Sequence, residues 1–246
     1  CAHNKCTFCG SFKDKKFRIR KIEEVYEDLE MARKYYRHIE KIFLADGDAL
    51  VLKNSYLMDV LNRIRELFPE CQRVGIYGRA HDILRKTDEE LLELKANGMG
   101  IIYVGVESGN PEILKKINKG ETREELIEAV RKAEALGIET SLTFLSGIGG
   151  RAMWRENAVD TGTMISEMEP TYASFLTLMI VPGTPLHEEY LKGEFDFAKN
   201  IRIDHRNSFA FHAGLGIAVP YGNAKTIPFE KQYFSGGANS VRGWSV

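Results

Sequence analysis

The chain has 246 residues, of which 43% are hydrophobic and 28% are charged, a composition typical of a globular protein of one large domain or two small ones. Lysine and arginine (34) nearly balance aspartate and glutamate (35), so charge alone excludes any general argument for a polyanion-binding protein. No uninterrupted run of about 18 apolar residues occurs, and we predict no membrane-spanning helix. The chain does not begin with methionine and carries no leader pattern, so we expect an internal fragment.

Helical and strand-like segments alternate through the first 200 residues. Charged segments with an apolar stripe predict helices, and short apolar runs predict buried strands. The expected helices cover residues 22–37, 54–68, 88–97, 122–136, 151–168 and 186–192. The expected strands cover residues 41–45, 73–77, 101–106, 138–145 and 172–181. This alternation predicts a parallel sheet with crossover helices, open or closed into a barrel.

Polar and glycine-rich motifs follow four of these strands. Ligands in such folds bind beyond the carboxyl ends of the strands. The motifs at those ends are Asp46–Asp48, Glu107–Gly109, Ser146–Gly150 and Pro182–Pro185. We expect ordinary turn chemistry for the two prolines. Glu107 closes an apolar strand, and its carboxylate needs a partner there, so we predict a functional role for it.

Cys1, Cys6 and Cys9 form a C-x4-C-x2-C pattern on a predicted loop. Such spacing favours a metal site in a reducing compartment over a disulfide framework. Three thiolates fill three corners of a [4Fe–4S] cube, whereas a structural zinc site needs four ligands, and His3 is the candidate for the fourth. We interpret Cys71 as a buried or partly buried apolar residue.

The amino-acid composition of the chain changes near residue 200. Residues 201–246 hold only five basic and two acidic residues, and they are rich in glycine. Apolar and small residues alternate over 208–219, which predicts a strand, and a turn is expected over 220–224. We therefore divide the chain into two domains, residues 1–200 and 201–246.

The stretch CAHNKCTFCG over residues 1–10 resembles the cluster loop of radical S-adenosylmethionine (SAM) enzymes, with one extra residue in the first gap and an aromatic Phe8 before the last cysteine. Further similarities follow in the family's order along residues 1–200: ADGD at 45–48, GVESG at 105–109, SGIGG at 146–150 and VPGTPL at 181–186. The last of these is similar to the branch shared by elongator-type, MiaB-type and coproporphyrinogen dehydrogenases. Five ordered matches are more specific than any one of them.

The resemblance implies an α/β fold, an incomplete (β/α)6 partial barrel of the radical SAM type that lacks its first strand. It implies a [4Fe–4S] cluster held by Cys1, Cys6 and Cys9, with the open iron binding SAM. The reduced cluster would cleave SAM to a 5′-deoxyadenosyl radical that abstracts hydrogen from a substrate. An external one-electron donor of the flavodoxin or ferredoxin type is implied as a partner.

The resemblance also assigns residues to SAM. Asp46, Gly47 and Asp48 would contact its methionine amino group, although Asp48 stands where the family usually has glutamate. Phe8 would lie against the adenine, and Glu107 would meet the ribose hydroxyls or the amino group. Ser146 and Gly147 would pass close to the adenosine.

The tail resembles part of an outer-membrane surface-antigen barrel of the BAM and TAM assembly family. The similar segments are residues 219–223, 228–234 and 235–244. Forty-six residues are too few for a closed barrel, which needs at least about eight strands. We expect a β-hairpin-like tail with an exposed edge, joined to an unrelated domain.

Two alternatives to a radical SAM enzyme stay open: a non-catalytic metal or Fe–S module, and an outer-membrane barrel fragment, which would require alternating strands throughout. The substrate, a small molecule or an RNA, is not specified by the sequence. The basic stretch over residues 13–21 is interpreted as a solvated face. We expect residues 1–200 to be cytoplasmic and free of membrane segments.

Overall fold

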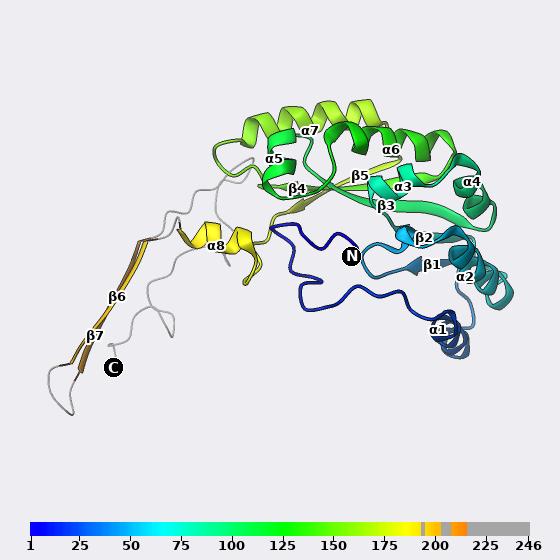
Figure 1. Ribbon diagram of the computed structural model, residues 1–246, viewed down its shortest axis with the longest axis horizontal. Coiled ribbons are helices and arrows are strands. Elements are labelled where there is room, and N and C mark those ends of the chain that lie inside the picture. The colour runs from blue at the N-terminus through cyan, green and yellow to red at the C-terminus, as the bar shows by residue number, and fades with distance from the viewer. Residues whose placement is uncertain (193–194, 203–207, 216–246) are drawn as a thin grey trace. The chain divides into compact units, whose positions relative to one another are not determined.

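The computed structural model describes residues 1–192, 195–202 and 208–215 and divides the chain into two compact units, residues 1–184 and 185–246, which are treated separately (Figure 1). The helices of the first unit are α1 (Ile22–Tyr35), η1 (Ala49–Val51, a 3-10 turn), α2 (Asn54–Leu67), α3 (Ala80–Arg85), α4 (Asp88–Ala96), α5 (Pro111–Lys116), α6 (Arg123–Ala135) and α7 (Trp154–Met168). Its strands are β1 (Lys41–Leu44), β2 (Arg73–Tyr77), β3 (Met99–Glu107), β4 (Glu139–Ser146) and β5 (Tyr172–Thr177).

The five strands form one parallel sheet in the order β1-β2-β3-β4-β5. Each strand pairs with the next one along the chain, and at least one helix lies between them in sequence. Parallel neighbours require such crossovers, which return the chain to the same end of the sheet. The carboxyl ends of all five strands therefore share one edge, as expected of a partial barrel.

One face of the sheet carries the hydrophobic core. Alternate strand residues such as Val74, Ile76, Val104 and Leu142 are buried together with apolar residues of α2, α4, α6 and α7. Fully burying a side chain of this size contributes roughly 2 kcal/mol. The helices that separate the strands therefore cover a single face of the sheet.

The opposite face is more open and carries aromatic side chains. Phe43 on β1 lies edge-to-face against Tyr77 on β2 and Tyr103 on β3, with ring centroids 4.7 and 5.0 Å apart. Phe43 and Tyr77 remain partly exposed. In the register of the sheet Phe43 stands beside Gly75, which lacks a side chain and leaves room for the ring.

Two helix starts show how the sequence sets the boundaries. Thr87 precedes α4 and Thr122 precedes α6, and each threonine hydroxyl accepts a hydrogen bond from the backbone N–H three residues later. The glutamates at those positions, Glu90 and Glu125, accept the threonine N–H in return. These reciprocal capping boxes fix the first turn of each helix.

The predicted fold class is confirmed, and two short helices were missed. The six-residue helices α3 and α5 lie within segments that the sequence analysis left without structure. Fewer than two turns give too few positions for a helical apolar period to stand out. Asn110 and Pro111 provide a signal for α5, because asparagine caps a helix and proline favours its first position.

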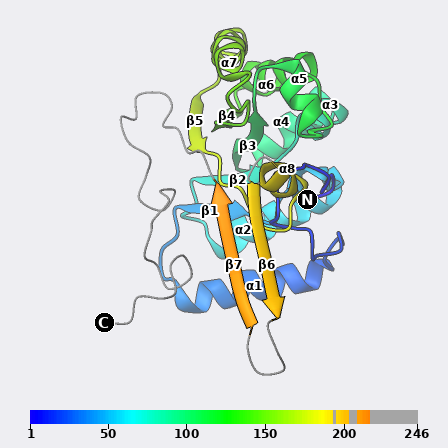
Figure 2. The same cartoon turned by 90° about the vertical axis from the view of Figure 1, so that its left-hand side faces the viewer.

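The second unit contains α8 (Pro185–Lys192) and the strands β6 (Phe195–Arg202) and β7 (Ser208–Leu215). These strands pair antiparallel, with Phe195 opposite Leu215 and Arg202 opposite Ser208 (Figure 2). β7 lies within the tail where a hairpin was expected, but its partner β6 begins before residue 201, so the pair coincides with that expectation only in part. The expected turn over 220–224 and the tail motifs lie outside the described residues. No helix among the described residues is both long and apolar enough to cross a bilayer.

Candidate functional site

The cysteine loop, residues 1–10, lies against the turn that follows β1. A Cβ built on Gly47 would come within 2.9 Å of the backbone nitrogen of Cys1 and 2.8 Å of the Phe12 ring. Gly47 and its neighbour Asp46 both have a φ of +79°, a left-handed conformation that glycine adopts without strain. The structure therefore brings the acidic turn and the first cysteine of the loop into contact.

Asp48, the third residue of this turn, is buried, and neither carboxylate oxygen has a partner at normal hydrogen-bonding distance, although the Ala2 N–H of the cysteine loop is near enough to lower its pKa slightly. Burial and the negative charge of Asp82 at the start of α3 raise the pKa of Asp48 to about 7. Asp82 is buried as well, and one of its oxygens also lacks a donor. A proton held between the two carboxyls satisfies them, and a cation arriving there would do the same.

The loop also binds the turn between α5 and α6, residues 117–121, which we call the α5–α6 turn. His3 Nε2 lies 2.7 Å from the backbone oxygen of Asn118. The Asn118 side chain donates to the Lys5 carbonyl at 3.2 Å, and the Thr7 N–H donates to the Ile117 carbonyl at 2.9 Å. Three hydrogen bonds thus connect loop and turn.

Glu107 occupies a distorted end of β3. The pairing of β3 with β4 shifts register between Gly105 and Glu107, and Glu107 has a φ of +72°. Such a bulge re-aims a side chain, and here the carboxylate folds back over Gly105, where no side chain blocks it. A left-handed glutamate is strained, and strain of this kind clusters at functional sites.

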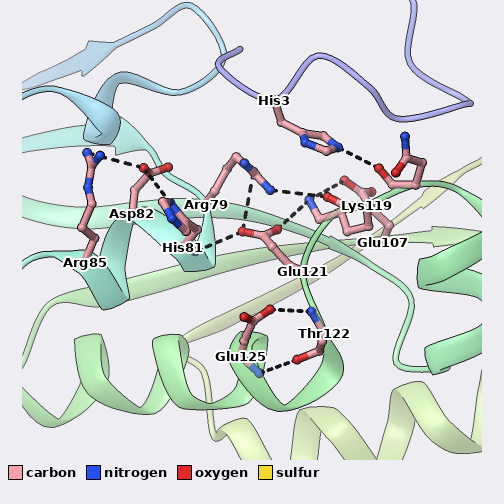
Figure 3. Close-up of polar contacts among 11 residues, drawn as sticks. His3, Arg79, His81, Asp82, Arg85, Glu107, Lys119, Glu121, Thr122 and Glu125 are labelled. Carbon is pink, nitrogen blue, oxygen red and sulfur yellow. Dashed lines mark hydrogen bonds and ion pairs between the residues drawn. The ribbon is translucent and has the colours of Figure 1, made fainter.

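Lys119 and Glu121 lie beside that carboxylate, and Arg79 pairs with Glu121 (Figure 3). Lys119 Nζ lies 3.8 Å from Glu107 Oε1 and 3.5 Å from Glu121 Oε2, and Arg79 Nε lies 3.6 Å from Glu121 Oε1. The His81 N–H also donates to Glu121 at 3.1 Å. Burial raises the pKa of Glu107, and the Lys119 ammonium opposes that shift. The partner that the sequence required for Glu107 is therefore Lys119.

The three loop cysteines are half-buried free thiols. Burial raises the pKa of Cys6, and the nearby Lys119 charge lowers it again in part. Within residues 1–192, 195–202 and 208–215, no three His, Cys, Asp or Glu side chains lie close enough together to hold a metal ion. The residues fit an Fe–S cluster by their chemistry, because Cys1, Cys6 and Cys9 are three free thiols on one short loop.

The end of the loop reaches the segment after β5. A Cβ on Gly10 would come within 2.9 Å of Val181, which belongs to the VPGTPL motif. Ser146 and Gly147 end β4 at the same sheet edge, where the Ser146 carbonyl accepts the Leu178 N–H at 2.9 Å. Phe8 is half-buried within the loop. The loop contacts described above reach the turns after β1 and β5 and the α5–α6 turn, rather than the turn after β4.

Sequence reasoning missed several charged residues of this edge. Asp82, Lys119 and Glu121 are buried here and Arg79 is partly buried, although charged residues are mostly exposed in proteins. No spacing rule marked them, because Arg79 precedes and Asp82 lies within the missed helix α3, while Lys119 and Glu121 lie in the α5–α6 turn. His3, the candidate zinc ligand, instead places Nε2 on a backbone carbonyl.

Cys71 and the basic stretch over residues 13–21 lie outside this site. Cys71 is half-buried and packs against the hydrophobic core, as expected. The basic stretch over residues 13–21 is exposed, and two of its arginines form ion pairs with α1, Arg18 with Glu24 and Arg20 with Asp28. These contacts agree with a solvated face.

Two family matches divide the chain. The radical SAM superfamily matches residues 1–161, and the Omp85 superfamily domain matches residues 166–246. The second match agrees with the resemblance of the tail to an outer-membrane barrel protein, and it begins before β5. The division of the chain at residue 200 stays a prediction.

Among curated relatives, an uncharacterized methyltransferase of Pyrococcus horikoshii is 29% identical over 191 residues, covering 76% of this chain and 39% of the relative. A tRNA-2-methylthio-N(6)-dimethylallyladenosine synthase of Oceanobacillus iheyensis is 36% identical over 106 residues, covering 41% of this chain and 20% of the relative. The chain thus spans less than half the length of these two relatives.

Three solved structures share the fold. The HemN coproporphyrinogen III oxidase of Escherichia coli has a TM-score of 0.57 at 20% identity, covering 73% of this chain and 42% of that one. TsrM of Kitasatospora setae, solved with cobalamin and a [4Fe–4S] cluster, has a TM-score of 0.60 at 23% identity (78% and 38% covered). Elp3 of Methanocaldococcus infernus has a TM-score of 0.52 at 18% identity (70% and 45% covered).

These findings confirm the predicted branch, whose MiaB-type, coproporphyrinogen-type and elongator-type members are all represented. The family's cofactors are a [4Fe–4S] cluster and SAM. The match covers well over half of the chain, and the sheet carries the fold expected for it. The chain therefore belongs to the radical SAM superfamily of enzymes.

Proposed function

We propose that this chain carries the SAM-cleaving site of a radical SAM enzyme. The observation that carries the proposal is the contact between the cysteine loop and the acidic turn after β1, which joins Cys1 to Gly47. When bound, a [4Fe–4S] cluster and SAM supply reductive cleavage to a 5′-deoxyadenosyl radical, which abstracts hydrogen from a substrate. The side chains of the chain bind and orient these groups.

Cys1, Cys6 and Cys9 hold the cluster in this proposal. Their half-buried positions shield the site from bulk water. Burial raises the pKa of Cys6, and the Lys119 charge partly offsets that rise in favour of the thiolate, which is the form that binds iron. Three thiolates leave one iron without a protein ligand, which suits an external chelating group. An external one-electron donor of the flavodoxin or ferredoxin type completes the system.

The acidic turn suits the ammonium group of the methionine moiety. Asp48 is buried, has no donor at normal hydrogen-bonding distance from either oxygen, and has a pKa of about 7. An ammonium ion would supply the missing donor and stabilise the ionised carboxylate. Asp46 and Gly47 shape the turn through their left-handed backbone. Binding should therefore strengthen as the pH rises through about 7, because Asp48 must lose its proton to form the ion pair.

The remaining assignments rest on the family resemblance. Glu107 presents a buried carboxylate for ribose hydroxyls or an amino group. Phe8 lies against the adenine in this proposal, and Ser146 and Gly147 lie close to the adenosine. The substrate, a small molecule or an RNA, remains to be identified by assay, and we propose a cytoplasmic location for residues 1–200.

The test is anaerobic reconstitution with iron and sulfide, followed by electron paramagnetic resonance of the reduced chain with and without SAM. Cys6→Ala should abolish the cluster signal, whereas Cys71→Ala, which removes a thiol outside the loop, should leave it unchanged. In the unsubstituted chain the signal should shift when SAM is added. A cluster whose signal ignores SAM, or tight zinc binding instead, would overturn the proposal in favour of a non-catalytic metal-binding module.

A further inference from the structure

We propose that His3 is a positioning residue, which holds the cysteine loop on the α5–α6 turn in the arrangement that receives the cluster. The identity of the cluster rests on the function proposed above. The contact between loop and turn is a property of the chain itself, and it can be tested without any metal.

The contact is built from three hydrogen bonds in parallel. His3, Lys5 and Thr7 alternate along the loop, and each meets Ile117 or Asn118 of the turn. The His3 bond is the shortest at 2.7 Å, and it spans 115 positions in sequence. One side of an extended loop segment is thus held against a turn that comes much later in the chain.

The turn is shaped to receive the histidine ring. Asn118 and Gly120 have φ values of +53° and +73°, so the backbone is left-handed on both sides of Lys119. A Cβ on Gly120 would come within 2.6 Å of His3 Cε1 and 3.1 Å of Nδ1. The imidazole therefore lies directly on the glycine, and a larger residue there would push it away.

The same turn connects the loop to the buried charges. Lys119 lies between the two residues that contact His3, its carbonyl accepts a hydrogen bond from Arg79 at 3.4 Å, and its side chain lies between Glu107 and Glu121. A displaced loop would expose the half-buried Cys6 thiol to reagents in solution, so His3 controls how accessible that thiol is.

The test compares variants of the full chain. His3→Ala removes the donor, His3→Gln keeps an N–H that can reach the carbonyl, and Gly120→Ala pushes against the ring. His38→Ala is the matched control, because His38 is exposed and pairs only with nearby Glu40 among the contacts described for it. Without metal, alkylation of Cys6 by iodoacetamide is followed by peptide mass spectrometry, with Cys71 as internal reference. After reconstitution, iron loss to a chelator is measured.

We expect His3→Ala to increase both the Cys6 alkylation rate and the rate of iron loss about five-fold, the effect of one lost hydrogen bond. Gly120→Ala should behave similarly, and His3→Gln and His38→Ala should resemble the unsubstituted chain. Wild-type Cys6 reactivity in His3→Ala would overturn the proposal. Reactivity in His3→Gln as high as in His3→Ala would also overturn it, because the donated hydrogen bond would not be what holds the loop.

The two measurements separate this inference from the proposed function. If the chain takes up no cluster, the iron measurement fails for every variant, and the alkylation rates still decide whether His3 holds the loop. If the cluster forms and its signal responds to SAM, but Cys6 is equally reactive in all variants, the proposed function stands and the proposed role of His3 is wrong.

Discussion

The helix-covered face of the sheet and its carboxyl edge are both buried, but they bury different groups. The face buries apolar side chains such as Ile76 and Leu142, whereas the edge buries Asp48, Lys119 and Glu121. Burying apolar groups stabilises a fold, and burying charges destabilises it unless they are paired. The apolar residues under the helix-covered face therefore supply most of the folding stability. The carboxyl edge of the sheet instead holds buried charges that a ligand can pair with.

The largest expected loss of stability comes from a substitution in the apolar core under the helix-covered face of the sheet. Leu94 of α4 is fully buried, and Leu94→Ala should lower the free energy of unfolding by about 4 kcal/mol, because it leaves a cavity in the core. Leu92→Ala, in the same helix but 44% exposed, should cost less than about 0.5 kcal/mol. Urea denaturation measures both, and equal losses would contradict the assignment of stability to this face.

At the edge, Lys119→Met should lower the free energy of unfolding by about 3 kcal/mol at pH 8, because it leaves Glu107 and Glu121 buried without their ammonium partner. Without the Lys119 ammonium the pKa of Glu107 in the folded chain should rise further, so the loss should shrink at pH 5, where that carboxyl can take up a proton. Lys115→Met on the exposed side of α5 is the control. A loss independent of pH would argue against the buried carboxylates as its cause.

A smaller effect is expected from Asp48, whose pKa of about 7 in the folded chain exceeds the ordinary value near 3.9 of an unfolded chain. Between these values the folded chain holds a proton that the unfolded chain has lost, so stability falls as the pH rises. Urea denaturation should show a loss of about 2 kcal/mol from pH 5 to pH 7, and Asp48→Asn should remove that slope. The same slope in the variant would assign the proton to another group.

The smallest effect concerns the junction between edge and face. Thr122 follows Glu121 and caps α6, so Thr122→Ala should lower the free energy of unfolding by about 1 kcal/mol. Thr122→Ser keeps the hydroxyl and should retain most of that stability. Cys6 alkylation should stay unchanged in both variants, and a large change would show that α6 and the cysteine loop are coupled more tightly than the comparison allows.

Much of the fold was predictable because it follows from periodicity. The apolar runs over 73–77 and 101–106 read directly as buried strands, and the charged, striped segments between such runs as helices. Alternation of these two patterns leaves few topologies other than a parallel sheet. The polar residues after the strands were therefore placed correctly at one edge.

The contacts within that edge were not predictable in the same way. Nothing near His3 in sequence indicates that its partner is Asn118, because the contact depends on how five strands and their crossovers are arranged. The bulge that re-aims Glu107 is one extra residue in an otherwise regular strand. Lys119 and Glu121 are buried in a turn whose backbone is left-handed at Asn118 and Gly120. Lysine and glutamate are usually exposed, so nothing in the sequence indicates that these two are buried.

The separation between the cysteine loop and its docking turn has a consequence for biosynthesis. Asn118 is translated 115 residues after His3, which takes roughly ten seconds at about 5–20 residues per second. During that interval the three thiols emerge without the surface that shelters them. They are then open to oxidation and to capture by zinc or copper, so correct iron loading depends on how fast the remainder of the sheet forms.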